Sequence, residues 1–259
     1  MNVENIDTSI APVITFVATG PGSAEYLTQE SIKALTAAKK IYCFGTQIGE
    51  RYTSRTLDTL RQLDSNMAEK AVVLTLPMSA QRQAAHEAYE RLTQQLCANH
   101  AEGLHVAICV EGSANIYASV RYVMQRLTDL DIPYTETAGI PSFIAAAAMA
   151  HLSLCEQQER LMVIPGTITS DEIEAFISHN TNLVVMKLSQ CTPAIHECIS
   201  RHPDYQYHYF ENVGTREQFY TTDIHHLRSL TQFPYFSLLI IKPRSEKADS
   251  SESTNFLTR

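Results

Sequence analysis

The sequence predicts an α/β fold of two domains, each a β-sheet flanked by helices. In the first half, short β-branched and aromatic runs alternate with longer amphipathic stretches, which is typical of a largely parallel sheet covered by helices. In the second half, the closing strand candidates follow one another with no helix between them, which indicates antiparallel pairing in a second, mixed sheet. The chain has 259 residues and is 44% hydrophobic, so it has enough apolar surface for cores of this size.

Each element follows from its local pattern. Clusters of β-branched and aromatic residues bounded by turn formers predict strands in the first domain at 13–18, 40–44, 71–76 and 105–110. Amphipathic spacing predicts helices between them at 28–38, 51–63, 80–99 and 117–129. The same criteria predict strands in the second domain at 133–137, 160–164, 182–188, 207–211 and 235–241. Its helices are expected at 142–152, 170–179 and 193–200.

The domain boundary is expected near 131–137, which gives a first domain at 13–132 and a second domain at 133–244. Residues 1–11 have neither the basic start nor the apolar core of a signal peptide, so secretion is not expected. Residues 1–12 are expected to form a flexible N-terminal tail. Residues 245–259 are charged and rich in Ser, which predicts a disordered C-terminal tail. The longest apolar stretch, 140–154, is shorter than the roughly 20 residues that span a bilayer and predicts a buried helix.

The composition disfavours several classes of function. The formal net charge is −8 at pH 7, whereas affinity for nucleic acid or an anionic membrane favours a surplus of Lys and Arg. The six cysteines are scattered and form no C-x-x-C pair, as expected of core thiols in a reducing cytoplasm. The neighbours His225 and His226 cannot face one metal ion from a single helical turn, so no protein-bound metal is expected.

The stretch VATGPGSAEYLT at 17–28 crowds Gly20, Pro21 and Gly22 into one turn after a strand. A phosphate-binding loop would place Lys followed by Ser or Thr at the helix start, and a dinucleotide fold would need G-x-G-x-x-G with an acidic residue after the next strand. Neither pattern is present. Pro21 fixes its own backbone and the glycines carry no side chain, so either a rigid wall for a broad ligand or an ordinary tight turn is expected.

Three further stretches favour a ligand site over an ordinary turn: EGSANIYAS at 111–119, TAGIPSFIAAAA at 137–148 and ERLMVIPGT at 159–167. In this order, with GPGSAEYLT at 20–28 and PYFSLLII at 234–241, the chain resembles the tetrapyrrole (corrin and porphyrin) methyltransferases over about residues 13–242. It looks most like the branch that methylates carbon 20 of precorrin-2 in cobalamin synthesis. That likeness is carried by the long insert at 45–70 and by SRTLDTL at 54–60, LPMSAQRQAAHEAYERL at 76–92, EGSANIYAS at 111–119 and the ending YFSLL at 235–239.

The resemblance implies a two-domain tetrapyrrole methylase fold with the active-site cleft between the domains, S-adenosylmethionine as the methyl donor, and a cytoplasmic homodimer. Its implied substrate is precorrin-2 or cobalt-factor II. The donor contacts carried over by position are Gly112, Ser113, Ile116, Ser142, Phe143, Met186, Asn212, Val213 and Ser237. Tyr117 is the catalytic candidate, expected at the start of a helix, with a core tyrosine as the alternative.

Substrate contacts are expected from Gly20, Pro21 and Gly22, which would line the trough for the macrocycle. The segment 39–82 carries seven basic and four acidic residues. Within it Arg51 and Arg55, one helical turn apart in the predicted helix, are expected to pair with carboxylates of the substrate. The alternative is a solvated helix face.

Methyl transfer from a sulfonium is an in-line displacement, so the protein is expected mainly to align the reactants in a dry site. Two departures from the family pattern leave alternatives open: Gly112 is followed by Ser113 and Ala114 where Gly-Asp-Pro is common, and Pro141 stands where Ser or Thr is common. Another branch of the same fold, acting on another tetrapyrrole or on RNA, is one alternative. A protein that binds donor or tetrapyrrole without turnover is the other.

Overall fold

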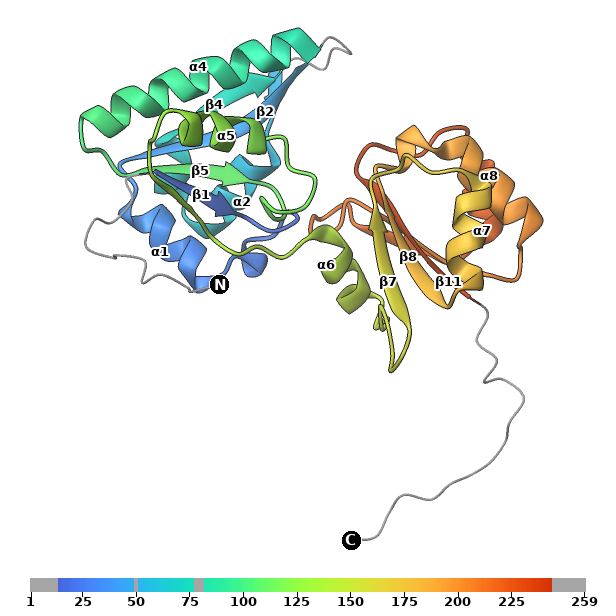
Figure 1. Cartoon of the computed structure of the whole chain (residues 1–259). Coiled ribbons are helices and arrows are strands. Elements are labelled where there is room, and N and C mark those ends of the chain that lie inside the picture. Colours follow the sequence, from blue (N-terminus) through green and yellow to red (C-terminus); the bar gives the residue numbers. More distant parts are fainter. Residues whose placement is uncertain (1–13, 49–50, 77–81, 244–259) are drawn as a thin grey trace, which may run out of the picture. The chain divides into compact units, whose positions relative to one another are not determined.

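The computed structural model describes residues 14–48, 51–76 and 82–243 (Figure 1). The chain forms two compact units, of which the first contains the residues up to Ala145 together with Val213–Arg216. The second contains Ala146–Asn212 and the residues from Glu217 onward. The division therefore lies later in the chain than the expected boundary at 132/133. The expected tails at 1–12 and 245–259 lie outside the described residues.

The first unit is built on a six-stranded sheet of order β3-β2-β5-β1-β6, in which β4 also pairs with β2. β1, β2, β4, β5 and β6 are parallel, and β3 is antiparallel to β2. Its strands are β1 (Ile14–Ala18), β2 (Lys40–Ile48), β3 (Arg51–Thr53), β4 (Ala71–Leu76), β5 (Val106–Val110) and β6 (Tyr134–Glu136). Its helices are α1 (Gln29–Ala37), α2 (Arg55–Leu63), α3 (Ser65–Glu69), α4 (Arg82–Ala101) and α5 (Arg121–Asp129).

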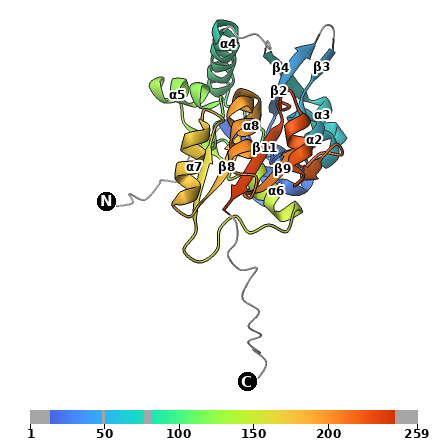
Figure 2. The ribbon, with the colours of Figure 1, turned by 90° about the vertical axis from the view of Figure 1, so that its right-hand side faces the viewer.

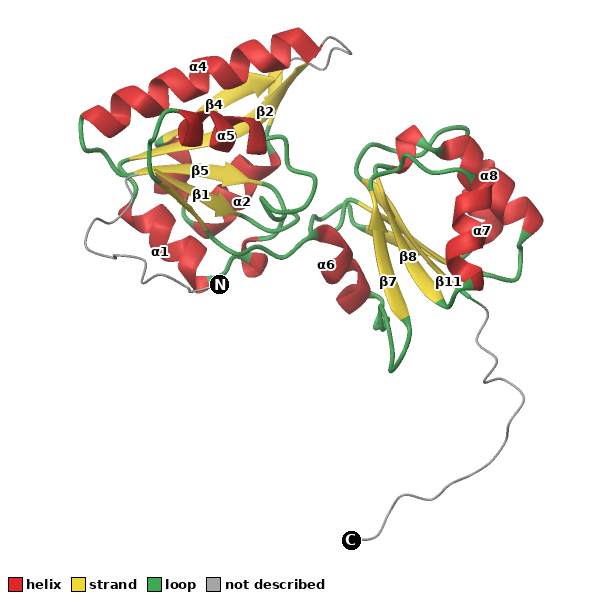
Figure 3. Cartoon of the chain, viewed as in Figure 1, coloured by secondary structure: helices red, strands yellow, loops and turns green. Residues whose placement is uncertain are grey.

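Helices cover both faces of this sheet, as the alternating pattern predicted (Figure 3). On one face, buried side chains of α4 and α5 such as Leu92 and Met124 pack with Phe16 of β1. On the other face, Leu35 of α1 and Leu57 of α2 belong to a second core. The central strands β1 and β5 are thus buried from two sides, which explains why these two strands read as nearly continuous apolar runs.

The second unit has a five-stranded sheet of order β10-β9-β11-β8-β7. β7 and β8 are parallel, whereas β11 is antiparallel to both β8 and β9, which confirms the mixed sheet. The strands are β7 (Arg160–Ile164), β8 (Thr181–Met186), β9 (Gln206–Glu211), β10 (Phe219–Thr221) and β11 (Ser237–Lys242). The helices are α6 (Ser142–Met149), which spans the unit boundary, α7 (Ser170–Ser178), α8 (Thr192–Arg201) and α9 (Ile224–Ser229).

α7 and α8 lie over one face of the second sheet (Figure 2). Their buried residues Ile173 and Ile195 share a core with Val185 and Tyr209 of the strands. α7 begins with a capping box, in which the Thr169 side chain accepts from the Glu172 amide and the Glu172 side chain accepts from the Thr169 amide. None of the described helices is long and apolar enough to span a membrane.

Two local predictions were wrong. The predicted helix 51–63 begins at Arg55, because Ser54 is extended and its side chain accepts from the Leu57 amide as an N-cap. Arg51 instead lies in β3, so Arg51 and Arg55 do not share a helix. The predicted helix 117–129 begins at Arg121, because Tyr117 has a φ of 49°, which a right-handed helix cannot contain. The strand expected at 133–137 was predicted in the second domain, but it joins the first sheet by pairing with β1.

Candidate active site

The carboxyl ends of the parallel strands β1, β5 and β6 meet at one edge of the first sheet. There the turn after β1 is joined to the turn after β5, because Gly112 N donates to Gly20 O (2.8 Å) and Gly20 N donates to Gly112 O (3.2 Å). Thr19 adds its amide and hydroxyl, both donating to Val110 O. Open α/β sheets bind ligands at this edge, so the edge is the candidate site of the first unit.

Gly112 leaves the main chain of this edge open. Its φ is +69°, and a Cβ placed there would meet nothing within 4 Å. Gly139 behaves in the opposite way, since a Cβ there would lie 2.4 Å from both Ala18 Cβ and Gly112 O. Gly139 therefore lets the turn after β6 pack tightly on the edge, while Gly112 keeps space free for a ligand to approach the backbone.

Side-chain hydroxyls fasten the turn after β6 to the same edge. Thr137 Oγ1 accepts from Ala18 N (3.0 Å), and Ser31 Oγ of α1 donates to Ala18 O (2.9 Å). The two hydroxyls are themselves 2.8 Å apart. Thr137 and Ser31 are both buried, so this network holds the edge rather than offering groups to a ligand.

The opening turn, formed by Gly20, Pro21 and Gly22 after β1, is held by hydrogen bonds and covered by another segment. Gly20, Pro21 and Gly22 are all buried, and the Gly22 carbonyl accepts from Thr59 Oγ1 and Gln62 Nε2 of α2, both at 3.2 Å. The segment Val213–Arg216 packs against the same turn, where a Cβ on Gly214 would lie 3.1 Å from Pro21 O. The role of this turn as a wall for the substrate stays a prediction.

Arg55, predicted as a substrate ligand, connects three segments of the first unit. Its Nε lies 3.0 Å from Glu111 Oε1, and its Nη2 donates to Pro21 O (2.9 Å) and to Val213 O (3.2 Å). The guanidinium therefore ties the opening turn and the returning segment to the end of β5. The side chain of Arg51 lies outside the described residues.

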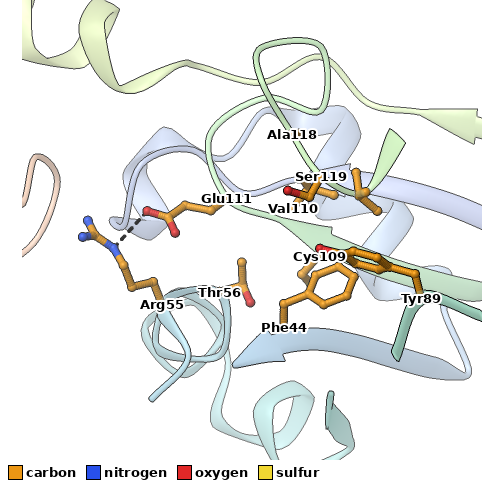
Figure 4. A pocket seen from close by; sticks show the side chains of 10 residues that line it. Phe44, Arg55, Thr56, Tyr89, Cys109, Val110, Glu111, Ala118 and Ser119 are labelled. Carbon is orange, nitrogen blue, oxygen red and sulfur yellow. Dashed lines mark ion pairs between the residues drawn. The ribbon is translucent and has the colours of Figure 1, made fainter. Parts of the chain in front are cut away.

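The ion pair of Arg55 and Glu111 forms one end of a pocket of about 210 Å³. Figure 4 shows the two side chains facing each other, with the rings of Phe44 and Tyr89 toward the other end. Removal of water from around the carboxyl raises the pKa of Glu111, although the charge of Arg55 acts in the opposite direction. The remaining lining residues are Thr56, Cys109, Val110, Ala118, Ser119 and Val120.

The donor-contact candidates of the first unit follow Gly112 along the chain. Ser113 is buried and its Oγ accepts from Asn115 N (3.3 Å), while Ala114 belongs to the core beneath α5. Ile116 is half-buried. Tyr117, the catalytic candidate, is 43% exposed, and its catalytic role stays a prediction. Of the candidates at the start of α6, Ser142 is half-buried and Phe143 is buried. These side chains are in place, but their contacts with a donor remain predictions.

Three candidates of the second unit gather at one edge of its own sheet. Met186 is paired with Leu238, the neighbour of Ser237, and Asn212 N donates to Phe236 O (2.9 Å). Val213, predicted with them, instead belongs to the first unit.

The backbone is strained at this edge of the second sheet. Lys187 and Asn212, which follow β8 and β9, both have positive φ angles. Gly166 after β7 packs so closely that a Cβ there would lie 2.5 Å from Lys187 O. Such strain is typical of ligand sites, and the edge is the candidate site of the second unit.

Glu111 is the site residue that the sequence interpretation missed. The signal available in the sequence was its position, directly after the predicted strand 105–110 and before Gly112. A charged residue at such a position lies at the carboxyl edge of the sheet. Within the described parts of the chain, no three His, Cys, Asp or Glu side chains come together as ligands for a metal ion.

The comparison with protein families decides the class. The sequence profile of the Tetrapyrrole (Corrin/Porphyrin) Methylases matches residues 13–227. The chain belongs to this family. It is accordingly an S-adenosylmethionine-dependent C-methyltransferase.

Several known methylases are similar to this chain. The precorrin-2 C(20)-methyltransferase of Sinorhizobium is 24% identical over 229 residues, which cover 87% of this chain and 93% of the relative. The cobalt-precorrin-2 C(20)-methyltransferase of Salmonella typhimurium is 26% identical over 176 residues, which cover 66% of this chain and 71% of the relative.

Solved structures show the same two-domain fold. The cobalt precorrin-4 methyltransferase CbiF has a TM-score of 0.64 at 13% identity, covering 88% of this chain and 94% of that protein. The uroporphyrin-III C-methyltransferase of Thermus thermophilus, solved with S-adenosyl homocysteine, has a TM-score of 0.59 at 16% identity, covering 88% and 96%.

Proposed function

We propose that this methylase transfers the methyl group of S-adenosylmethionine to carbon 20 of precorrin-2, or of its cobalt-containing form, in cobalamin biosynthesis. The supporting observation is the likeness to the Sinorhizobium precorrin-2 C(20)-methyltransferase, which extends over nearly the full length of both chains. The Salmonella relative is named for the same ring carbon with cobalt present, so both forms of the substrate enter the test.

The fold does not select the ring carbon. Precorrin-4 and uroporphyrin-III methylases have comparable TM-scores at low identity, so branches that act on other substrates share this architecture. The choice of carbon 20 therefore rests on the named relatives and on the segment 45–70, which forms the end of β2 with β3, α2 and α3.

The first unit fits a donor that lies against main chain. The free space at Gly112, beside a turn fixed by Gly139, admits a ligand that no side chain obstructs. We propose donor contacts at Gly112, Ser113, Ile116, Ser142 and Phe143, with further contacts from Met186, Asn212, Val213 and Ser237. The bound donor supplies an electrophilic methyl group on sulfur. The protein's part is to orient it and keep water away.

Transfer of a labelled methyl group identifies the substrate and the ring carbon that is methylated. The protein is incubated with S-adenosylmethionine carrying a ¹³C methyl group, together with precorrin-2 or its cobalt form, and the product is analysed by mass spectrometry and carbon NMR. We expect one added methyl group at carbon 20. A label at another ring carbon assigns the protein to another branch, and no transfer to either substrate contradicts the proposal.

The donor site is tested with two matched glycines. Gly112→Ala and Gly103→Ala both place a Cβ where φ is close to +70° and where no atom lies within 4 Å. Each variant is expected to lose about 1 kcal/mol of unfolding free energy. In calorimetric titrations with S-adenosyl homocysteine, Gly112→Ala alone is expected to bind more weakly. Equal affinity in both variants would place the donor elsewhere.

We also propose a cytoplasmic homodimer, which rests on the family resemblance alone. Sedimentation equilibrium at micromolar protein concentration tests the dimer. A single species at the 29.0 kDa mass of one chain would contradict it.

A further inference from the structure

We propose that Glu111 accepts the proton released from the methylated ring carbon, and that Arg55 is the positioning residue that holds its carboxylate toward the pocket. This inference rests on the proposed function, because a meso carbon that carries hydrogen must lose a proton once it has been methylated.

The chemistry requires a proton acceptor. A bond forms between the ring carbon and the methyl carbon while the methyl–sulfur bond breaks, and its electron pair stays on sulfur as a neutral thioether. The ring carbon then carries both methyl and hydrogen. When its C–H bond breaks, the electron pair returns to the ring as a double bond and the proton goes to a base. A carboxylate becomes a carboxylic acid in this step and later releases the proton to water.

Glu111 has the required position. It follows β5 directly and precedes Gly112, where the main chain is open to a ligand. Among the described residues that line the pocket it is the only carboxylate. Its side chain is 36% exposed and is paired with Arg55 at 3.0 Å, so part of it is accessible to a ligand.

Arg55 fixes the direction of this carboxylate. The guanidinium is 17% exposed, and its two hydrogen bonds to the Pro21 and Val213 carbonyls hold it against the protein. A base whose partner is itself anchored keeps its geometry through the reaction. In the ion pair Nε lies 3.0 Å from Oε1, and the substrate would approach the side of the carboxylate turned away from Arg55.

The surroundings favour Glu111 as the titrating group of the pocket. Arg55 faces Glu111 directly. The other polar and titratable residues that line the pocket are Thr56 of α2, Tyr89 of α4, Cys109 of β5 and Ser119 after β5. A hydrogen bond with Cys43 and burial raise the pKa of the Cys109 thiol well above its usual value. The pKa of Glu111 is raised by burial against the influence of Arg55, which makes it a stronger base than an ordinary carboxylate.

The test compares Glu111→Gln with the wild type and with Glu90→Gln as a matched control. Glu90 also lies in the first unit and is ion-paired with an arginine, at 2.9 Å from Arg126, but it lies outside the pocket. We expect kcat of Glu111→Gln to fall about 100-fold, with the affinity for S-adenosyl homocysteine unchanged. Glu90→Gln should retain wild-type kcat.

Two readouts separate proton transfer from a structural role. With substrate deuterated at carbon 20, Glu111→Gln is expected to show a primary isotope effect, because C–H cleavage becomes the slow step. The wild-type kcat should also decline as the pH falls through the pKa of Glu111, and this acidic limb should vanish in the Gln variant. A reduced kcat with neither change would mean that Glu111 only supports the fold, and an unchanged kcat would also overturn the proposal.

Glu111→Asp covers the case in which the Gln variant does not fold. It keeps a carboxylate on a shorter arm, so we expect a reduced kcat with the acidic limb preserved, and loss of that limb or a wild-type kcat would refute the proposal. If the wild type methylates no tetrapyrrole, the proposed function fails. If the wild type methylates carbon 20 and the Glu111 variants match it, the proton acceptor alone is refuted.

Discussion

Glu111 in the first unit and Glu159 in the second are both carboxylates paired with a cation, yet their surroundings differ. Glu159 Oε2 accepts from Glu156 N and from Asn182 Nδ2, both at 2.9 Å, and lies 3.6 Å from Lys242 Nζ. For Glu111, Arg55 is the one cation within ion-pair distance among the described residues. Burial alone would raise the pKa of Glu159. The hydrogen bonds from Asn182 and Glu156 and the charge of Lys242 outweigh this effect, so the pKa is lowered overall. The pKa of Glu111 is raised.

The difference separates a structural carboxylate from one available for chemistry. Several donors stabilise the charged form of Glu159, so protonating it costs free energy and the group serves to join segments. Glu111 has one anchored partner on one side and a pocket on the other, and burial raises its pKa. An ion pair alone therefore does not distinguish the two carboxylates, whereas the number of donors around each one does.

The largest effect is expected from removing the cation beside Glu111. Arg55→Ala leaves the carboxylate and the carbonyls of Pro21 and Val213 without their partner, so the unfolding free energy should fall by about 3 kcal/mol. Urea denaturation measures this. Arg126→Ala, which breaks an ion pair whose arginine is 53% exposed, is the control and should change stability by less than about 1 kcal/mol. Equal losses in the two variants would contradict the structural role of Arg55.

A smaller loss is expected from the corresponding change at Glu159. Lys242→Met keeps most of the aliphatic side chain but removes the charge and the hydrogen bond to Ser153 O (3.0 Å). Asn182 and the Glu156 amide still stabilise the carboxylate, so denaturation should show a loss of about 1 kcal/mol. A loss as large as that of Arg55→Ala would mean that the additional donors at Glu159 do not compensate.

The smallest effect is a pH dependence of opposite sign at the two carboxylates. The folded pKa of Glu111 lies above its unfolded value, so its contribution to stability falls as the pH rises from the unfolded pKa through the folded one. The folded pKa of Glu159 lies below its unfolded value, so its contribution is present above the unfolded pKa and is lost as the pH falls through the folded one.

Urea denaturation of the wild type, Glu111→Gln and Glu159→Gln between about pH 3 and pH 6 measures these slopes. The difference between wild type and Glu111→Gln should decrease with rising pH, and the difference for Glu159→Gln should increase. Slopes of the same sign would show that the two carboxylates do not differ as described.

Most strands were predictable from sequence because β-branched, aromatic and other apolar residues cluster in them between turn formers. The expected strands 71–76 and 160–164 coincide with β4 and β7. β3 and β10 have three residues each and were missed, although β6, which is equally short, was predicted at 133–137. The helix predicted from Arg51 was wrong because amphipathic spacing extends across Ser54, and a single N-cap outweighs it.

The candidate site was predictable only where a motif is local. The turns at Gly20 and Gly112 appear as glycines after strands, and the structure places both at one edge. The partners of Arg55 lie in segments far apart in sequence, at Pro21, Glu111 and Val213. Contacts over such separations leave no periodic signal in one chain. Sequence reasoning therefore singled out Arg55 but not its contacts with these partners, and a contact of Arg55 with the substrate stays a prediction.

The return of Val213–Arg216 to the first unit has a consequence for synthesis. A ribosome makes the chain from its amino end, so β1 to β6 emerge before the segment that covers the opening turn. Until Val213 has emerged, Arg55 lacks one of its carbonyl partners and the turn at Pro21 lacks its cover. The first unit is therefore completed only after β7, β8 and β9 have left the ribosome, which couples its maturation to nearly the whole length of the nascent chain.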